Sequence, residues 1–354
     1  MTEVPGLDVA GLTDWMRRAH PELAPGELTA QVIAGGKSNL TYRVDGAGIP
    51  LVVRRPPLGH VLASAHDMGR EHRVISALRG TPVPVPPAID FVDDTADAEV
   101  TGTPFFVMQF VEGMVMSRPD QNAAFSAAGL RSLSLRLAEV LADLHAVDPV
   151  SVGLGDFGRA DGFLERQLRT WRRQYDASRS RDLPALDRLQ DDLAARMPAS
   201  NRSSLVHGDY RLDNAIVAPA QDSGSAETAR IAAILDWEMS TIGDPLVDLG
   251  MFGLYWNVGA LPGAGAALPS AIDPAAGYPA FEELVDAYAA RAGIPVPDLS
   301  WYGAFAAYKL GVIAEGIHFR FGRGETVGAG FDRIGALVEP IAGEGLRQLR
   351  AGRR

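Results

Sequence analysis

The chain has 354 residues, of which 47% are hydrophobic and 22% are charged, so its composition excludes wholesale disorder. Asp and Glu number 44 against 33 Lys and Arg, a formal charge of −11, which argues against a nucleic-acid partner because phosphate binding needs a basic surface. The absence of cysteine excludes disulfides, thiol nucleophiles and cysteine-ligated zinc. The first residues lack the features of a signal peptide, and no apolar run reaches the roughly 20 residues of a membrane span, so we expect a cytoplasmic protein without a membrane partner.

The first 112 residues alternate between strand and turn patterns after an initial helix. Apolar residues at i, i+3 and i+4 predict helices over residues 8–19 and 68–78. Runs of β-branched and aromatic residues predict strands at residues 28–33, 40–44, 51–54, 88–92 and 104–111. We therefore expect residues 1–112 to form a mainly β lobe that carries the N-terminal helix.

Beyond Gly113 the pattern becomes largely helical. Helices are predicted over residues 130–145, 163–175 and 186–197, followed by short strands at 204–206, 215–218 and 231–235 and by more helices to the C-terminus. Residues 261–279 are rich in Ala, Gly and Pro and predict a mobile loop. The expected fold class is α+β, with a small β-rich N-lobe (1–112) and a larger, mostly helical C-lobe (113–354).

The strongest chemical signal is the segment His207–Asn214 (HGDYRLDN), followed by an apolar strand that ends at Asp236. Phosphoryl transfer from a nucleotide needs one carboxylate for the attacking hydroxyl and oxygen ligands for Mg²⁺ on the phosphates. Asp209 suits the first role, and Asn214 and Asp236 suit the second. The alternative is that these residues only form turns, because loops commonly use Asp, Asn and Gly.

These motifs resemble the aminoglycoside phosphotransferase/choline kinase family, whose fold is similar to that of protein kinases. In that family the loop reads His-Gly-Asp with Asn five residues after the Asp, and Asp236 matches the later metal-binding aspartate. The segments Val53–Pro57 and Ser64–Asp67, followed by Arg70 and Glu71, resemble the branch whose members stand alone or are fused to acyl-CoA dehydrogenases. The resemblance implies a two-lobed protein-kinase-like fold with ATP and Mg²⁺ as cofactors, and leaves GTP open as the nucleotide.

The turn at residues 35–39 (GGKSN) contains Gly-Lys-Ser but is not a Walker A loop. That motif needs a glycine where this chain has Gln31, and it joins a strand to a helix, whereas this turn joins two predicted strands. A glycine-rich hairpin over nucleotide phosphates fits better, with Gly36, Ser38 and Asn39 as nucleotide-binding residues. An ordinary β-turn remains the alternative.

In kinases the third strand carries a lysine that binds the phosphates and pairs with a glutamate of the next helix. The matching position here is Arg54, with Arg55 as the alternative register, and the matching glutamate is Glu71. By the same resemblance the strand around Met108 is the hinge. Met108 is then the gatekeeper, and Gln109 and Val111 offer backbone groups to the adenine.

The resemblance also implies two supporting residues and a place for the acceptor. Asp248 and His207 are expected to hold the catalytic loop by hydrogen bonds. The phosphate acceptor is expected among the C-terminal helices, where the candidate wall residues are Tyr255, Trp256, His318 and Arg320.

We therefore predict an enzyme that transfers the γ-phosphoryl group of ATP to the hydroxyl of a small molecule. The branch resemblance favours a hydroxy acid or hydroxyacyl-CoA, while the family name allows an aminoglycoside. A catalytically weak nucleotide-binding protein is the reading from another class, because arginine replaces the usual lysine. The expected partners are a nucleotide and a hydroxylated small molecule, and the expected assembly is a monomer or homodimer.

Overall fold

The computed structural model describes residues 4–23, 26–33, 39–58, 67–200, 202–219, 229–324 and 331–352. The chain divides into two compact units. The first contains residues 1–112 and 232–238, and the second contains residues 113–231 and 239–354. The segment 232–238 therefore belongs to the first unit, whereas the sequence pattern placed it in the C-terminal lobe.

The first unit is built on an antiparallel sheet with the strand order β1-β2-β3-β5-β4. Its strands are β1 (Thr29–Val32), β2 (Leu40–Asp45), β3 (Leu51–Arg55), β4 (Ala88–Val92) and β5 (Phe105–Gln109). Its helices are α1 (Val9–Ala19), the 3₁₀ turn η1 (Pro21–Leu23) and α2 (Met68–Leu78). The predicted strands and both predicted helices are confirmed, with shifts of one or two residues at their ends.

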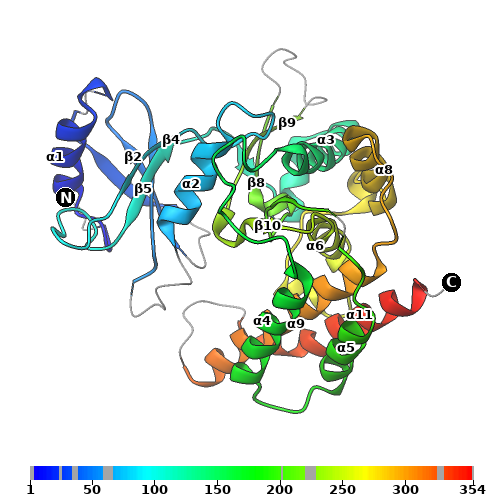
Figure 1. The fold of residues 1–354 in the computed structure, drawn as a ribbon. Helices are drawn as coiled ribbons and strands as arrows, with labels where there is room; N and C mark the ends of the chain where they lie inside the picture. Colours follow the sequence, from blue (N-terminus) through cyan, green and yellow to red (C-terminus); the bar gives the residue numbers. More distant parts are fainter. Residues whose placement is uncertain are drawn as a thin grey trace. The chain divides into compact units, whose positions relative to one another are not determined.

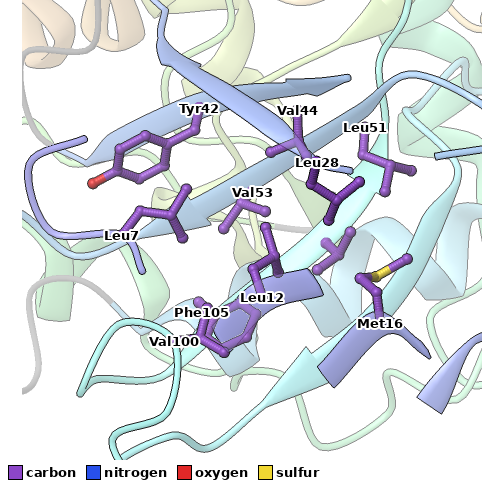
Figure 2. Close-up of a cluster of buried hydrophobic side chains, with 11 residues drawn as sticks. Leu7, Leu12, Met16, Leu28, Tyr42, Val44, Leu51, Val53, Val100 and Phe105 are labelled. Carbon is purple, nitrogen blue, oxygen red and sulfur yellow. The ribbon is translucent and has the colours of Figure 1, made fainter. Parts of the chain in front are cut away.

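Helix α1 lies beside the sheet (Figure 1), and its apolar side chains complete the hydrophobic core of this unit. Asp8 caps the helix, because its carboxylate accepts hydrogen bonds from the N–H groups of Ala10 and Gly11. Leu12 and Met16 then lie on the buried face, one turn apart, and pack with side chains of the sheet (Figure 2). Those sheet residues include Tyr42, Val44, Val53 and Phe105.

The second unit is mainly helical. Its α-helices are α3 (Ala127–Ala146), α4 (Phe163–Ser178), α5 (Pro184–Ala195), α6 (Leu246–Trp256), α7 (Ala264–Ala267), α8 (Phe281–Ala292), α9 (Ser300–Gly322), α10 (Phe331–Ile334) and α11 (Val338–Ala351). Its 3₁₀ turns are η2 (Pro119–Ala124), η3 (Leu212–Asn214), η5 (Val258–Ala260), η6 (Pro274–Ala276) and η7 (Gly335–Leu337), and η4 (Trp237–Met239) spans the boundary between the units. Helix α3 packs along α8, and α9 packs against both α6 and α11 (Figure 1).

Short strands carry the loop that contains Asp209. Strand β7 (Ser204–Val206) pairs with β10 (Thr241–Gly243), while β6 (Met114–Val115), β8 (Ala215–Pro219) and β9 (Ala229–Ile234) form a second small sheet. The chain leaves β7 at Val206 and enters β8 at Ala215, so residues 207–214 connect one small sheet to the other. A loop fixed at both ends by strands is a suitable place for catalytic side chains.

Residues 261–279, predicted to form a mobile loop, contain short helical turns and buried side chains. This segment contains α7 and η6, and it buries Ala271 and Tyr278. The buried side chain of Asn122 fixes it, because its amide nitrogen donates to the carbonyl of Ala271 and its oxygen accepts from the Tyr278 hydroxyl. These contacts come from a residue about 150 positions earlier, which the local composition does not reveal.

Candidate active site

Arg54 lies at the centre of a cluster of charged side chains in the first unit. Its Nε donates to a carboxylate oxygen of Glu71 at 2.9 Å, and its Nη2 donates to Asp236 at 2.7 Å. Arg55, the next residue of β3, points to the other face of the sheet and donates to the carbonyls of Gly6 and Thr101. Successive side chains of a strand point to opposite faces, so only Arg54, and not Arg55, reaches Glu71. The predicted pair of a strand cation and a helix glutamate is therefore Arg54 and Glu71.

Burial controls the electrostatics of this cluster. Burial raises the pKa of Glu71, and the Arg54 guanidinium partly opposes that rise. Burial and the nearby Asp236 carboxylate raise the pKa of Glu238 to about 7. The side chain of Asn39 donates to Glu238 at 3.1 Å and is itself buried. Asn39 thus contacts an acidic residue of this cluster, and sequence reasoning missed Glu238, although it follows Asp236 by only two positions.

Asp236 has a backbone conformation that is uncommon for a residue with a side chain. Its φ angle is +67°, in the left-handed region, which costs about 1–2 kcal/mol for a non-glycine residue. The following Trp237 is fully buried and its indole N–H donates to the carbonyl of Ile234, so this burial and this hydrogen bond stabilise the turn. Residues kept in such a conformation cluster at functional sites.

The predicted hinge lies at the end of β5. Met108 is buried, the N–H of Gln109 donates to the carbonyl of Pro87 at 2.9 Å, and the N–H of Phe110 donates to the carbonyl of Pro50 at 2.9 Å. The chain is therefore fixed on both sides just before Val111. The predicted phosphate-binding residues Gly36 and Ser38 lie outside the described residues.

Asp209 is held by its own loop in the second unit. The amide nitrogen of Asn214 donates to the Asp209 carbonyl at 2.8 Å and to its carboxylate at 3.1 Å. Arg211 lies 3.4 Å from the same carboxylate and stacks on the ring of Tyr255, with 4.6 Å between guanidinium and ring centre. The Tyr255 hydroxyl hydrogen-bonds to Asp209, and burial together with that carboxylate raises the Tyr255 pKa. Three side chains therefore fix the orientation of the carboxylate.

Asp248 supports this loop from α6. Its carboxylate accepts hydrogen bonds from the N–H groups of His207 at 2.7 Å and Gly208 at 2.8 Å, and His145 lies 3.2 Å away. Burial alone would raise the pKa of Asp248, but the bond from His145 and the proximity of His207 outweigh it and lower the pKa. The ring of His207 in turn accepts from the N–H of Asp209 at 3.2 Å. Both residues contact the loop as the resemblance implied.

The acceptor candidates have separate environments. Tyr255 contacts Asp209, as described above. Trp256 is a core residue, because it is buried, packs on Phe252 and Tyr278, and donates from its indole N–H to the carbonyl of Pro279. The prediction that Trp256 lines an acceptor site is therefore not supported.

His318 and Arg320 lie near the end of α9. A rise of about 1.5 Å per residue places them roughly 14–17 Å along the helix from Lys309, which contacts the Asp209 loop. The ring of His318 lies against Gly335, and Arg320 is exposed. The structure does not bring these two side chains to Asp209. Arg211, whose guanidinium lies beside the Asp209 carboxylate, was given no role from the sequence.

The proposed metal ligands have suitable chemistry for Mg²⁺. The hydrogen bonds from the Asn214 side chain to Asp209 use its nitrogen, so its amide oxygen is chemically suited to a cation, and Asp236 offers carboxylate oxygens. Within the described ranges, no group of three or more His, Asp or Glu side chains is arranged to hold a metal by itself. A cation bound by either residue would therefore need further oxygen ligands, such as phosphate. No helix among the described residues is long and apolar enough to cross a membrane.

Residues 29–284 match the model of a family described as the phosphotransferase enzyme family. The chain is 34% identical over 330 residues to acyl-CoA dehydrogenase family member 11 of Gallus gallus and 33% identical over 311 residues to family member 10 of Mus musculus. These alignments cover 92% and 87% of this chain but 41% and 28% of the relatives, so the chain spans less than half the length of either.

Among solved structures, a candidate aminoglycoside phosphotransferase from Ralstonia eutropha matches with a TM-score of 0.80 and 31% identity, covering 98% of this chain and 99% of that one. An aminoglycoside phosphotransferase in ternary complex with ADP and hygromycin B has the same fold, with a TM-score of 0.61 and 14% identity over 97% and 99% of the two chains. The predicted kinase-like α+β fold is thereby confirmed. The chain belongs to the phosphotransferase enzyme family.

Proposed function

We propose that this phosphotransferase transfers the γ-phosphoryl group of ATP to a hydroxyl of a small molecule in the presence of Mg²⁺. The observation that carries the proposal is the geometry of Asp209. Its carboxylate is oriented by Asn214, Arg211 and Tyr255. Its loop is held by Asp248, whose carboxylate accepts a hydrogen bond from the N–H of Gly208. Such a carboxylate suits a base for the attacking hydroxyl.

Asp209 accepts the proton of the acceptor hydroxyl as the hydroxyl oxygen forms a bond to the γ-phosphorus. The bond between the γ-phosphorus and the oxygen that bridges it to the β-phosphate breaks, and ADP leaves with that electron pair. Tyr255 and Arg211 keep the carboxylate in place during the transfer. General-base assistance of this kind contributes about 10²–10⁴-fold to rate.

Residues of the first unit bind the nucleotide in this proposal. Arg54 binds phosphate oxygens and is oriented for this role by Glu71. Gly36, Ser38 and Asn39 contribute to phosphate binding, and the hinge residues Met108, Gln109 and Val111 to adenine binding. Asn214 and Asp236 would hold Mg²⁺, which when bound offsets the negative charge of the phosphates.

The acceptor in this proposal is a hydroxy acid or a hydroxyacyl-CoA. One observation supports it: the two named relatives are acyl-CoA dehydrogenase family members. An aminoglycoside is the second candidate acceptor. It is favoured by the likeness to the Ralstonia eutropha protein and by the net charge of −11, which suits a cationic substrate.

The first test is binding, followed by turnover. ATP and GTP, each with and without Mg²⁺, are compared by thermal shift, because a ligand at 100 times its Kd stabilises a protein by about 2.7 kcal/mol. ADP release is then measured with hydroxy acids, hydroxyacyl-CoA compounds and aminoglycosides as acceptors.

Asp209→Asn should reduce turnover by about 10²–10⁴-fold while the ATP-induced thermal shift is kept. Asp286→Asn, which changes an exposed aspartate of α8, is the matched control and should retain full turnover. Absence of any thermal shift with either nucleotide, with or without Mg²⁺, would contradict nucleotide binding. That result would also contradict a catalytically weak nucleotide-binding protein, and the resemblance would then record ancestry more than present function.

A further inference from the structure

The chain uses lysine in only two places. Of its 33 Lys and Arg residues, 31 are arginines, and the two lysines are Lys37 and Lys309. Lys309 lies on α9 and is 5% exposed. Charged residues are almost never fully buried unless they are paired, so a buried lysine in a chain that otherwise uses arginine needs a specific partner.

The partner of Lys309 is the loop that carries Asp209. The Nζ atom donates a hydrogen bond to the carbonyl oxygen of Gly208, and it lies 5.3 Å from the centre of the Trp171 ring. Burial lowers the pKa of Lys309, and the carboxylates of Asp209 and Asp248 oppose this shift. The ammonium group therefore lies in a dry environment in which two carboxylates stabilise its charge.

The contact is made to one particular peptide group, the one that joins Gly208 to Asp209. Its oxygen accepts from Lys309, and its N–H donates to the ring of His207 at 3.2 Å. The preceding N–H, that of Gly208, donates to Asp248. Since a peptide group is planar, fixing both its oxygen and its nitrogen fixes the position from which the Asp209 side chain projects.

We propose that Lys309 is a positioning residue for Asp209, which holds the Gly208–Asp209 peptide in the orientation that phosphoryl transfer requires. The inference rests on the proposed function of Asp209 as the base. It assigns to α9, about 100 positions later in the chain, control over the geometry of the catalytic loop. A lysine suits this place because its ammonium is a compact charge at the end of a narrow stem, whereas a planar guanidinium needs a wider space.

The test compares Lys309→Met and Lys309→Ala with the wild type, with Mg²⁺-ATP as substrate and water or the best acceptor of the panel as nucleophile. Both variants should lose about 10²-fold in kcat, because a displacement of about 1 Å at the reacting groups costs that much, while KM for ATP stays within about twofold. Tyr308→Phe is the matched control. It alters the neighbouring residue of α9, whose hydroxyl donates to Gln190 of α5 and does not contact the loop, so its kcat should be unchanged.

Chemical rescue separates positioning from stability. Propylammonium has the atoms that Lys309→Ala removes beyond Cβ, and it should restore kcat in a saturable manner, whereas 1-propanol, which lacks the charge, should not. Retention of kcat in Lys309→Met would overturn the proposal. Failure of propylammonium to restore kcat, or failure of both variants to fold, would also overturn it and assign Lys309 to stability alone.

A readout without turnover distinguishes this inference from the proposed function. Hydrogen exchange of the peptide that covers residues 204–214 should accelerate in Lys309→Met and not in Tyr308→Phe. A wild-type protein that does not consume Mg²⁺-ATP would contradict the proposed function, even if this exchange result were obtained. A wild-type protein that does consume it, with unchanged exchange and kcat in Lys309→Met, would contradict only the role of Lys309.

Discussion

Replacing Arg54 with methionine should destabilise the first unit mainly through Glu71. The Glu71 side chain is 2% exposed and that of Arg54 is 14% exposed, so the substitution leaves a buried carboxylate without its cation. Breaking a buried pair in this way costs about 3–5 kcal/mol. We expect the lower end, about 3 kcal/mol, because Glu71 keeps a hydrogen bond from the backbone of Trp237.

The stability lost in Arg54→Met should increase as pH rises. Burial already raises the pKa of Glu71, and removal of the Arg54 charge raises it further. In the folded variant Glu71 keeps its proton at pH values where the unfolded chain has released it. The free energy of unfolding of the variant therefore falls as pH rises above the pKa that Glu71 has in the unfolded chain. Destabilisation should therefore be larger at pH 8.5 than at pH 5.5. The double variant Arg54→Met with Glu71→Gln should recover most of the lost stability and show little dependence on pH.

Hydrogen exchange in urea, followed in residues 40–58 and 67–78, reports the stability of the first unit alone. Arg55→Met is the matched control, because Arg55 is similarly buried but donates to carbonyl groups, so its loss should not vary with pH. Stability of Arg54→Met within about 1 kcal/mol of the wild type at both pH values would refute this reasoning.

Three further predictions concern single side chains. Asp248→Asn should cost about 2–4 kcal/mol in urea denaturation, since an amide cannot accept from both loop N–H groups. Because the pKa of Asp248 is lowered in the folded protein, its carboxylate should stabilise the wild type at all pH values above about 3.8, the ordinary pKa of an aspartate, and this stabilisation should be lost as pH falls further. Glu238→Gln should gain about 1–2 kcal/mol at pH 8 in EDTA and nothing at pH 4.5, because a folded pKa raised to about 7 makes stability fall as pH rises, an effect reduced by partial exposure. Gly208→Ala should lower both the melting temperature and kcat, because φ is +87° and a Cβ would lie 2.6 Å from the Met239 carbonyl oxygen.

The parts of the site that the sequence predicted are those with local signals. Asp209 and Asn214 lie in one loop, and the five-residue spacing places the Asn214 amide against the Asp209 backbone. The pair of Arg54 and Glu71 follows from a strand and the next helix. The choice between Arg54 and Arg55 stayed open in the sequence because both are cationic, and the structure decides it because successive residues of a strand point to opposite faces.

The parts that could not be predicted depend on contacts between distant segments. Residues 232–238 belong to the first unit because β9 ends beside the proline-rich segment, where the N–H of Ile234 donates to the carbonyl of Pro84. Nothing in the local pattern of either segment indicates that contact.

The same limit explains why Tyr255 and Trp256 were treated alike. Both are aromatic residues at the end of α6, but neighbouring side chains on a helix project about 100° apart. One therefore contacts Asp209 and the other enters the core. Trp256 packs on Phe252 and Tyr278 and donates to the carbonyl of Pro279, and these contacts hold it away from the loop. Helix α6 carries Tyr255 and packs against α9, which carries Lys309, and both side chains contact the Asp209 loop. Substitutions in the interface between α6 and α9 should therefore alter kcat without touching any residue of the loop.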